Sequence, residues 1–257
     1  MKLTRTLLPA MAAAGVLAFG LSVNAATLTD GGSIGLGAAD NTTEVSVTAG
    51  SQGFRIAGAG SLTAFNGTVY DYAFYDTNAD PSIPTTVGPE GLIGSLSDTA
   101  GTDSKVALWT TSDPSSDPAD VTNVGVRWQD NATFTVDISG LASGSVYVFN
   151  GSWQARSDWL EVAMTGTGQA TVNSHSGGDT VFALSPATSG VLMNAKRVDF
   201  ADASAYDTLT FTLQESTEGQ NGYFAGVVVT NVTLVPEPGS LALLSLGGIC
   251  VLRRRRK

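Results

Sequence analysis

The chain has 257 residues and carries 13 Lys and Arg against 23 Asp and Glu, so its formal net charge is −10 at neutral pH. Because seven of the cations lie in the two terminal segments, residues 26–234 are more acidic than the whole chain, and such a body is repelled by nucleic acid and by anionic lipid. The body has one histidine and no cysteine, since Cys250 lies near the C-terminus, which argues against disulfides, zinc sites and thiol catalysis.

The first 25 residues have the three parts of a secretory signal peptide. A short positive start is followed by an apolar run over residues 7–21, rich in Ala and Leu, and then by small residues. This order predicts cleavage by signal peptidase between Ala25 and Ala26, with export of the chain that follows. An N-terminal anchor that stays uncleaved is the alternative. We therefore interpret residues 1–25 as a signal peptide.

The body, residues 26–234, is rich in Thr, Ser, Gly, Val and Asp, a composition that favours strands joined by turns over helices. Apolar and polar residues alternate in many short segments, which turn dipeptides separate. This pattern predicts an all-β fold, either an antiparallel β-sandwich or a jelly roll. The clearest predicted strands lie at residues 45–47, 68–74, 105–109, 124–128, 134–138, 146–149, 160–164, 208–213 and 228–234.

A Gly-rich segment lies before the first of these strands. Residues 31–35 spell the G-x-S-x-G pattern of a serine nucleophile, but neither a buried strand before them nor a helix after them is predicted. We interpret this segment as a flexible Gly-rich stretch. The only histidine, His175, lies in a Gly-rich loop pattern and is predicted to be a solvated loop residue rather than a catalytic base. No catalytic residue and no enzymatic activity are therefore expected.

Two long connections rich in Pro and Asp interrupt the predicted strands, at residues 77–102 and 112–120. Both are consistent with long loops on one sandwich domain, which we favour. The first could instead separate a small N-terminal β unit from a larger one. A short helix is expected at most over residues 90–97, where Gly91 and Gly94 weaken it.

Oxygen ligands alternate at Asp76, Asn78 and Asp80, where the first long connection begins. This spacing resembles the start of a calcium-binding loop, although later positions do not fit the EF-hand pattern. Calcium is therefore the one cofactor that the sequence suggests, at a site of another kind that Asp71 or Glu90 could complete. Turn caps are the alternative explanation for these Asx residues. A weaker cluster consists of Asp113, Asp117 and Asp120.

Aromatic and acidic residues gather in the middle of the chain. Trp153 with Arg156 could form a platform on which a sugar ring stacks beside a hydrogen-bond donor, and core packing is the alternative. Asp158 and Glu161 could be the carboxylate pair that a glycosidase needs, although ordinary strand ends explain them as well.

The last 23 residues form a tail of three parts. A Pro-Glu-Pro block is followed by an apolar run over residues 241–252 that would be about 18 Å long as a helix, which is short for a membrane span. The cationic end should stay in the cytoplasm by the positive-inside rule. The sequence therefore predicts a short transmembrane helix that holds the body outside. The block is Val235, Pro236, Glu237 and Pro238, and the cationic end is Arg253, Arg254, Arg255, Arg256 and Lys257.

This three-part order resembles the PEP-CTERM sorting signal of Gram-negative bacteria. The resemblance covers residues 235–257 and implies recognition by an exosortase, a membrane-embedded cysteine transpeptidase, and an association with exopolysaccharide and biofilm. A plain C-terminal anchor is the alternative. Residues 147–234 also loosely resemble galactose-binding-like jelly rolls, in a Tyr-Val-Phe strand and a late Gly-Tyr-Phe-Ala-Gly segment.

Together these patterns predict an exported protein of the cell surface or of an exopolysaccharide matrix, which passes through a form anchored in the inner membrane. Its expected role is non-enzymatic, either structural and adhesive or carbohydrate-binding. The expected partners are signal peptidase, exosortase and extracellular polysaccharide. A secreted carbohydrate-active hydrolase with paired carboxylates is the alternative function, and a body that only spaces or coats is a third.

Overall fold

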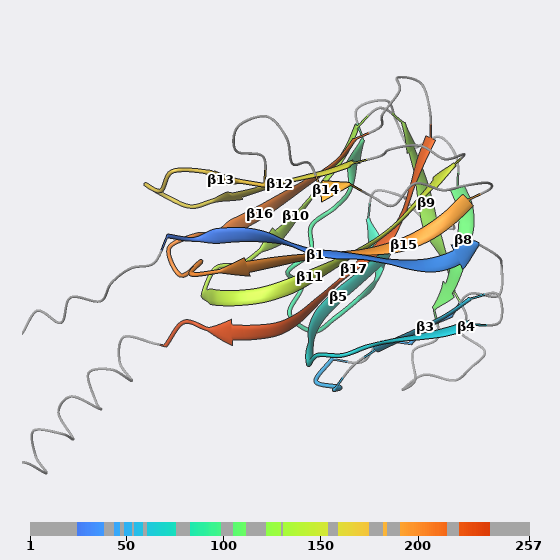
Figure 1. Cartoon of the computed structure of the whole chain (residues 1–257), viewed down its shortest axis with the longest axis horizontal. Coiled ribbons are helices and arrows are strands. Elements are labelled where there is room, and N and C mark those ends of the chain that lie inside the picture. The colour runs from blue at the N-terminus through green and yellow to red at the C-terminus, as the bar shows by residue number, and fades with distance from the viewer. Residues whose placement is uncertain are drawn as a thin grey trace, which may run out of the picture.

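The computed structural model describes residues 25–38, 44–46, 49–52, 54–58, 61–75, 83–98, 105–111, 122–129, 131–153, 159–174, 182–183, 191–214 and 221–236. Over these residues strands are the only regular secondary structure, and they form two sheets that pack face to face (Figure 1). The predicted all-β, sandwich-like fold is confirmed. In this part of the chain no helix is long and apolar enough to cross a membrane. Residues 1–24 and 237–257 lie outside it, so the signal peptide and the membrane span stay predictions.

The larger sheet has 11 strands, and all its neighbours pair antiparallel except β2 and β8, which are parallel. Two of the 11 strands lie off the main path of the sheet: β5 (Val69–Tyr75) pairs with β17, and β6 (Pro84–Val87) pairs with β5. The main order is β1 (Thr27–Ala38), β15 (Val191–Ala201), β11 (Leu141–Trp153), β17 (Asn221–Leu234), β9 (Thr122–Gln129), β8 (Lys105–Thr111), β2 (Glu44–Ser46), β3 (Phe54–Gly58) and β4 (Ser61–Phe65).

The smaller sheet has six strands, of which three carry most of the pairing. These are β12, β16 and β10, and every second residue along them is buried, so their alternating sequences are explained by one buried and one open face. The order is β13 (Val172–Asn173), β12 (Trp159–Thr165), β16 (Thr208–Gln214), β10 (Asn131–Asp137) and β7 (Ser97–Asp98), with β14 (Phe182–Ala183) beside β12.

Aromatic stacking joins the two sheets across the core. Phe134 of β10 lies parallel to Phe211 of β16 at a ring separation of 4.8 Å, and at 5.0 Å from Phe224 of β17 in the other sheet. All three rings are buried. Because burying one large apolar side chain contributes about 1.5–3 kcal/mol of hydrophobic free energy, each of the three rings stabilises the contact between the two sheets.

The larger sheet forks at β17. One edge of β17 pairs with β11, while the other pairs first with β9, over Asn221–Phe224, and then with β5 from Gly226 onward. At Gly226 the neighbouring strand comes so close that an added Cβ would lie 2.4 Å from the carbonyl oxygen of Ala73. A glycine is therefore required where the partner of β17 changes.

A second aromatic cluster fills the face of the larger sheet that points away from the smaller one. Phe65 of β4 contacts Tyr147 and Phe149 of β11 edge to face, and Phe149 also lies against Phe74 of β5. Contacts of β1 with β3 and β4 show that the two ends of this sheet approach each other. The sheet therefore curls around a small core of its own.

The short helix considered for residues 90–97 is wrong. This segment runs along the edge of the sandwich in an extended form, with backbone hydrogen bonds from Gly94 N–H to the Thr135 carbonyl and from Asp137 N–H to the Leu92 carbonyl. Gly91 has a φ of 64°, which no helical residue adopts. Bonding to β10 has replaced the local bonding that a helix would need.

The Gly-rich residues 31–35 are not a flexible stretch. They lie within β1, where Ser33 pairs with Lys196 and Ile34 with Ala195 of β15. The strand continues to Ala38, so no helix follows the serine and the nucleophile-elbow geometry is not formed. Shifts of register on both sides of this segment accommodate its glycines.

Candidate functional site

The open face of the smaller sheet carries a regular array of hydroxyl groups. In one row across the sheet, Thr212 of β16 lies between Glu161 of β12 and Thr133 of β10. In the next row, Thr210 pairs with Ala163 on one side and with Thr135 on the other. Neighbouring strands are about 4.8 Å apart, so these polar side chains form a nearly continuous surface.

A hollow of about 260 Å³ opens on this face between β12, β13 and β16. Its shape follows from the small side chain of Ala163, which lies in one row between Thr210 and Asn173. Ser174 closes the rim, because its backbone N–H donates to the Val162 carbonyl and its Oγ accepts from the Val162 N–H. The lining residues are Glu161, Val162, Ala163, Asn173, Ser174, Thr210 and Thr212.

The groups that line the hollow can form hydrogen bonds with a polyhydroxylated molecule. Threonine hydroxyls and the Asn173 amide can both donate and accept hydrogen bonds, and a carboxylate such as Glu161 accepts them. The volume lies below the roughly 300–1,000 Å³ of drug-sized pockets, so one sugar ring or side group would fill it. Glycoside hydrolysis would need a second carboxylate across the cleft. The predicted partner of Glu161, Asp158, lies outside the described residues.

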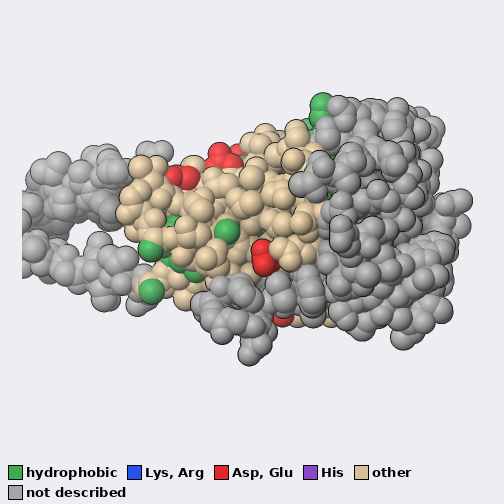
Figure 2. All heavy atoms as spheres, turned by 90° about the horizontal axis from the view of Figure 1, so that it is seen from above, with side chains coloured by type: hydrophobic (Ala, Val, Ile, Leu, Met, Phe, Trp, Pro, Cys, Tyr) green, Lys and Arg blue, Asp and Glu red, His purple; other side chains and the backbone are tan. Residues whose placement is uncertain are grey.

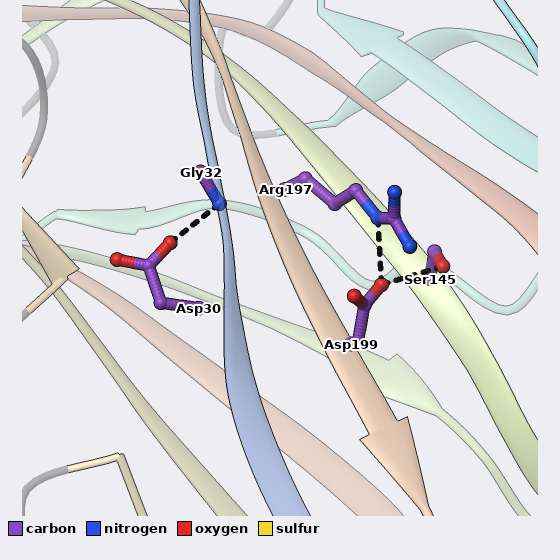
Figure 3. A network of polar contacts seen from close by, with 5 residues as sticks. All are labelled: Asp30, Gly32, Ser145, Arg197 and Asp199. Carbon is purple, nitrogen blue, oxygen red and sulfur yellow. Dashed lines mark hydrogen bonds and ion pairs between the residues drawn. The ribbon is translucent and has the colours of Figure 1, made fainter.

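A separate cluster of charged side chains lies at the junction of β1, β15 and β11, and its members pair with one another. Lys196 is 2% exposed and holds Asp30 of β1 at 2.7 Å. On β15, Asp199 accepts hydrogen bonds from the Arg197 Nε at 2.7 Å and from the Ser145 hydroxyl at 2.6 Å, while Asp30 also accepts from the Gly32 N–H (Figure 3). These bonds fasten the first strand of the body to the sheet.

The electrostatics of this junction agree with a structural role. The hydrogen bond to Asp199 raises the pKa of Arg197 above its ordinary value, so the guanidinium stays charged at any physiological pH. Burial raises the pKa of Tyr147, so its phenol stays neutral. Neither group is poised to exchange a proton near neutral pH, which does not favour acid–base chemistry here.

Asp71 of β5 is a buried carboxylate that fixes the segment after β6. Its Oδ2 accepts a hydrogen bond from the Leu92 N–H at 2.7 Å, and its Oδ1 accepts from the Glu90 N–H at 3.4 Å. Tyr75 holds the same segment by donating its hydroxyl to the Gly94 carbonyl at 2.6 Å. The carboxylate of Asp71 is 0% exposed and bonded to the backbone of Glu90 and Leu92, so it anchors this segment to β5.

Replacing Asp71 with Asn is expected to change how the free energy of unfolding depends on pH. Burial raises the pKa of Asp71, so the folded protein holds this proton more tightly than the unfolded chain does. The contribution of the protonated group is complete below the unfolded pKa and is lost as pH rises through the folded pKa. The stability advantage of wild type over D71N, measured by urea unfolding across the acid range, should therefore shrink as pH rises. An advantage that grows with pH would contradict this.

Several predicted site residues lie outside the described residues: Asp76, Asn78, Asp80, Arg156, His175 and the tail from Glu237 onward. Trp153 is the last residue of β11, and its side chain lies outside the described part of the structure. In the described part of the chain no three His, Cys, Asp or Glu residues are grouped as metal ligands. The calcium site and the Trp153–Arg156 platform stay predictions.

The structure places the predicted signal-peptide cleavage site and the start of the predicted sorting motif at the ends of paired strands. Ala25 is exposed and Ala26 packs partly against the core, directly before β1. Val235 follows β17 without a spacer, and its N–H donates to the Gly140 carbonyl at 2.8 Å. Asn173, Ser174, Thr210 and Thr212 are not predicted as site residues by the sequence pattern, although the threonines at positions 208, 210 and 212 alternate regularly.

The fold and the chain ends define an all-β body that carries a C-terminal sorting segment. Residues 234–257 match the PEP-CTERM protein-sorting motif. This motif implies sorting by an exosortase, through a tail anchored in the membrane, to the cell surface or beyond. It covers the tail only, and the body's likeness to galactose-binding-like domains stays a prediction.

No curated protein matches the chain. Among solved structures, the infectious bursal disease virus VP2 subviral particle is similar at 13% identity, covering 90% of this chain and 88% of that one, with a TM-score of 0.15. The structure of the infectious bursal disease virus Gx strain is similar at 12% identity, covering 89% and 88%, with a TM-score of 0.14. Similarities this weak say nothing about the fold or the site.

Proposed function

We propose that this protein is a non-enzymatic component of the cell surface or extracellular matrix, whose body binds extracellular polysaccharide through the open face of the smaller sheet. The observation that carries the proposal is the hollow beside Ala163, which gathers hydroxyl, amide and carboxylate groups on an otherwise hydroxyl-rich face. The sorting tail supports it, because a matrix polymer is then within reach of the exported body.

The charge of the body narrows the class of polysaccharide. On the face that Figure 2 shows, the described surface displays several acidic side chains and a few hydrophobic ones among backbone and side chains of other types, and no Lys or Arg is visible there. An anionic polymer would be repelled by this surface, whereas a neutral one would not. We therefore expect neutral glycans to bind better than acidic ones.

Replacing Ala163 with Leu is expected to fill the hollow and to weaken glycan binding at least about tenfold, which corresponds to about 1.4 kcal/mol. The matched control is Thr133→Val, on the same open face but outside the lining. The measurement is retention of the mature protein on the host's own exopolysaccharide. No retention of wild type, or equal retention of A163L and wild type, would contradict the proposal.

The alternative, a carbohydrate-active hydrolase, is supported by the presence of Glu161 in the hollow. It predicts that incubation with the same polysaccharide releases reducing ends and that Glu161→Gln stops the release. Under the binding proposal, wild type releases none, and E161Q changes affinity alone. The same preparations therefore separate the two functions.

A further inference from the structure

The chain enters and leaves the body at the same end of the larger sheet. Thr27, the first residue of β1, pairs with Ala201 of β15. One position along, Phe200 pairs with Gly144 of β11, and Ser143 pairs with Thr233 of β17. Thr27 and Thr233 therefore lie in one row, three strand spacings or about 14 Å apart. Figure 1 shows the start of β1 and the end of β17 on the same side.

The segments that connect this end to the two apolar runs are short. Residues 22–26 separate the N-terminal run from β1, and residues 236–240 separate Val235 from the C-terminal run. Val235 is itself fixed by its hydrogen bond to Gly140. Five extended residues reach at most about 18 Å. A body tethered by such segments keeps this end close to the membrane.

We propose that this end of the sandwich is the membrane-facing surface of the precursor, so that signal peptidase and exosortase cut at one end of one folded body. The surface consists of the Ser139–Gly140 turn, residues 166–168 and 202–205, and the two strand ends. Backbone hydrogen bonds tie these loops together, from Ala203 N–H to the Ala142 carbonyl and from Asp207 N–H to the Thr165 carbonyl. The proposal rests on the sorting tail and is independent of glycan binding.

The charge of this end indicates what holds it at the membrane. Asp137, Asp202 and Asp207 are all exposed there, and anionic headgroups repel them. The short tethers hold this end near the bilayer, and adhesion to lipid does not. A longer tether should therefore let the body move away.

The cysteine-free body permits a direct test. In the signal-cleaved chain, residues 26–257, Cys250→Ser removes the only thiol. Ser139→Cys then introduces one on an exposed residue at this end, or Ile83→Cys introduces one away from it, next to β6, whose partner β5 pairs with the middle of β17. Each form is labelled with a fluorophore and inserted in phosphatidylethanolamine–phosphatidylglycerol vesicles that contain a headgroup nitroxide lipid. Quenching at position 139 is expected to exceed that at position 83 several-fold.

A second variant separates tethering from lipid binding. An insert of about 20 Gly and Ser residues between Val235 and Pro236 adds about 25 Å of flexible reach. It is expected to reduce quenching at position 139 to the level seen at position 83. Equal quenching at both positions without the insert, or quenching at position 139 that survives it, would overturn the proposal. Neither outcome depends on polysaccharide, so failure of glycan binding is scored separately.

Discussion

Replacing Phe134 with Ala is expected to lower the free energy of unfolding by about 3–5 kcal/mol. Phe134 is buried, lies parallel to Phe211 at 4.8 Å, and contacts Phe224 from the opposite sheet at 5.0 Å. Truncation removes the ring's buried area and leaves a cavity between two sheets, each of which its own backbone pairing keeps rigid, so the surroundings relax only partially to fill it. The loss would be a large part of the roughly 5–15 kcal/mol that keeps a domain folded.

Urea unfolding of the mature protein measures this loss, because the midpoint falls while the slope stays constant if only stability has changed. Thr135→Ala is the matched control: it is one residue away on the same strand, and its side chain is on the exposed face. Phe134→Leu should lie between the control and F134A. A loss below about 1 kcal/mol in F134A would mean that the stack is not central to the core.

Ending the chain at Val235 is expected to move the protein almost completely from the membrane fraction to the soluble fractions, the periplasm and the medium. The tail supplies the apolar run and the five terminal cations, and the acidic body has no affinity of its own for anionic lipid. The end of β17 stays intact in this variant, since Val235 and its hydrogen bond to Gly140 are retained. Fractionation and immunoblotting of cells and medium measure the shift.

The matched control is Cys250→Ser in the full chain, which changes the apolar run without shortening it and should remain membrane-associated. Replacing Glu237 with Ala tests the motif itself, and this variant should stay anchored but unprocessed. Retention by matrix polysaccharide is separated by repeating the fractionation after washing with soluble polysaccharide. Truncated protein that still sediments with membranes after this wash would refute the role of the tail.

The sequence pattern predicts those strands that have one face buried in the core and the other face open to solvent. Residues 134–138 and 208–213 alternate strictly, because one face lies in the sandwich core and the other is open, and both are strands in the structure. β15 was missed because Lys196, Arg197 and Asp199 interrupt its apolar pattern. Arg197 and Asp199 pair with each other along the strand, but Lys196 pairs with Asp30 and Asp199 also bonds to Ser145, both far away in the sequence. Local patterns do not show such pairing.

The candidate site was less accessible to sequence reasoning than the fold. The threonines at positions 208, 210 and 212 are evident as a pattern, but the hollow depends on the register that places Ala163 beside Thr210 and Asn173. That register joins segments nearly fifty positions apart in the chain, between β12 and β16. An alanine on an exposed strand face carries no signal of its own. Only its larger neighbours make it the floor of a depression.

The position of β17 has a consequence for biogenesis. The last strand of the body lies inside the larger sheet, where it pairs with β11, β9 and β5. Those partners cannot complete their ladders until residue 234 has crossed the membrane. Such distant pairings form slowly, because the ordering of a long intervening loop precedes the gain from contact. The larger sheet therefore stays incomplete while the polypeptide crosses the membrane. The body reaches its native state only when the sorting signal itself arrives at the bilayer.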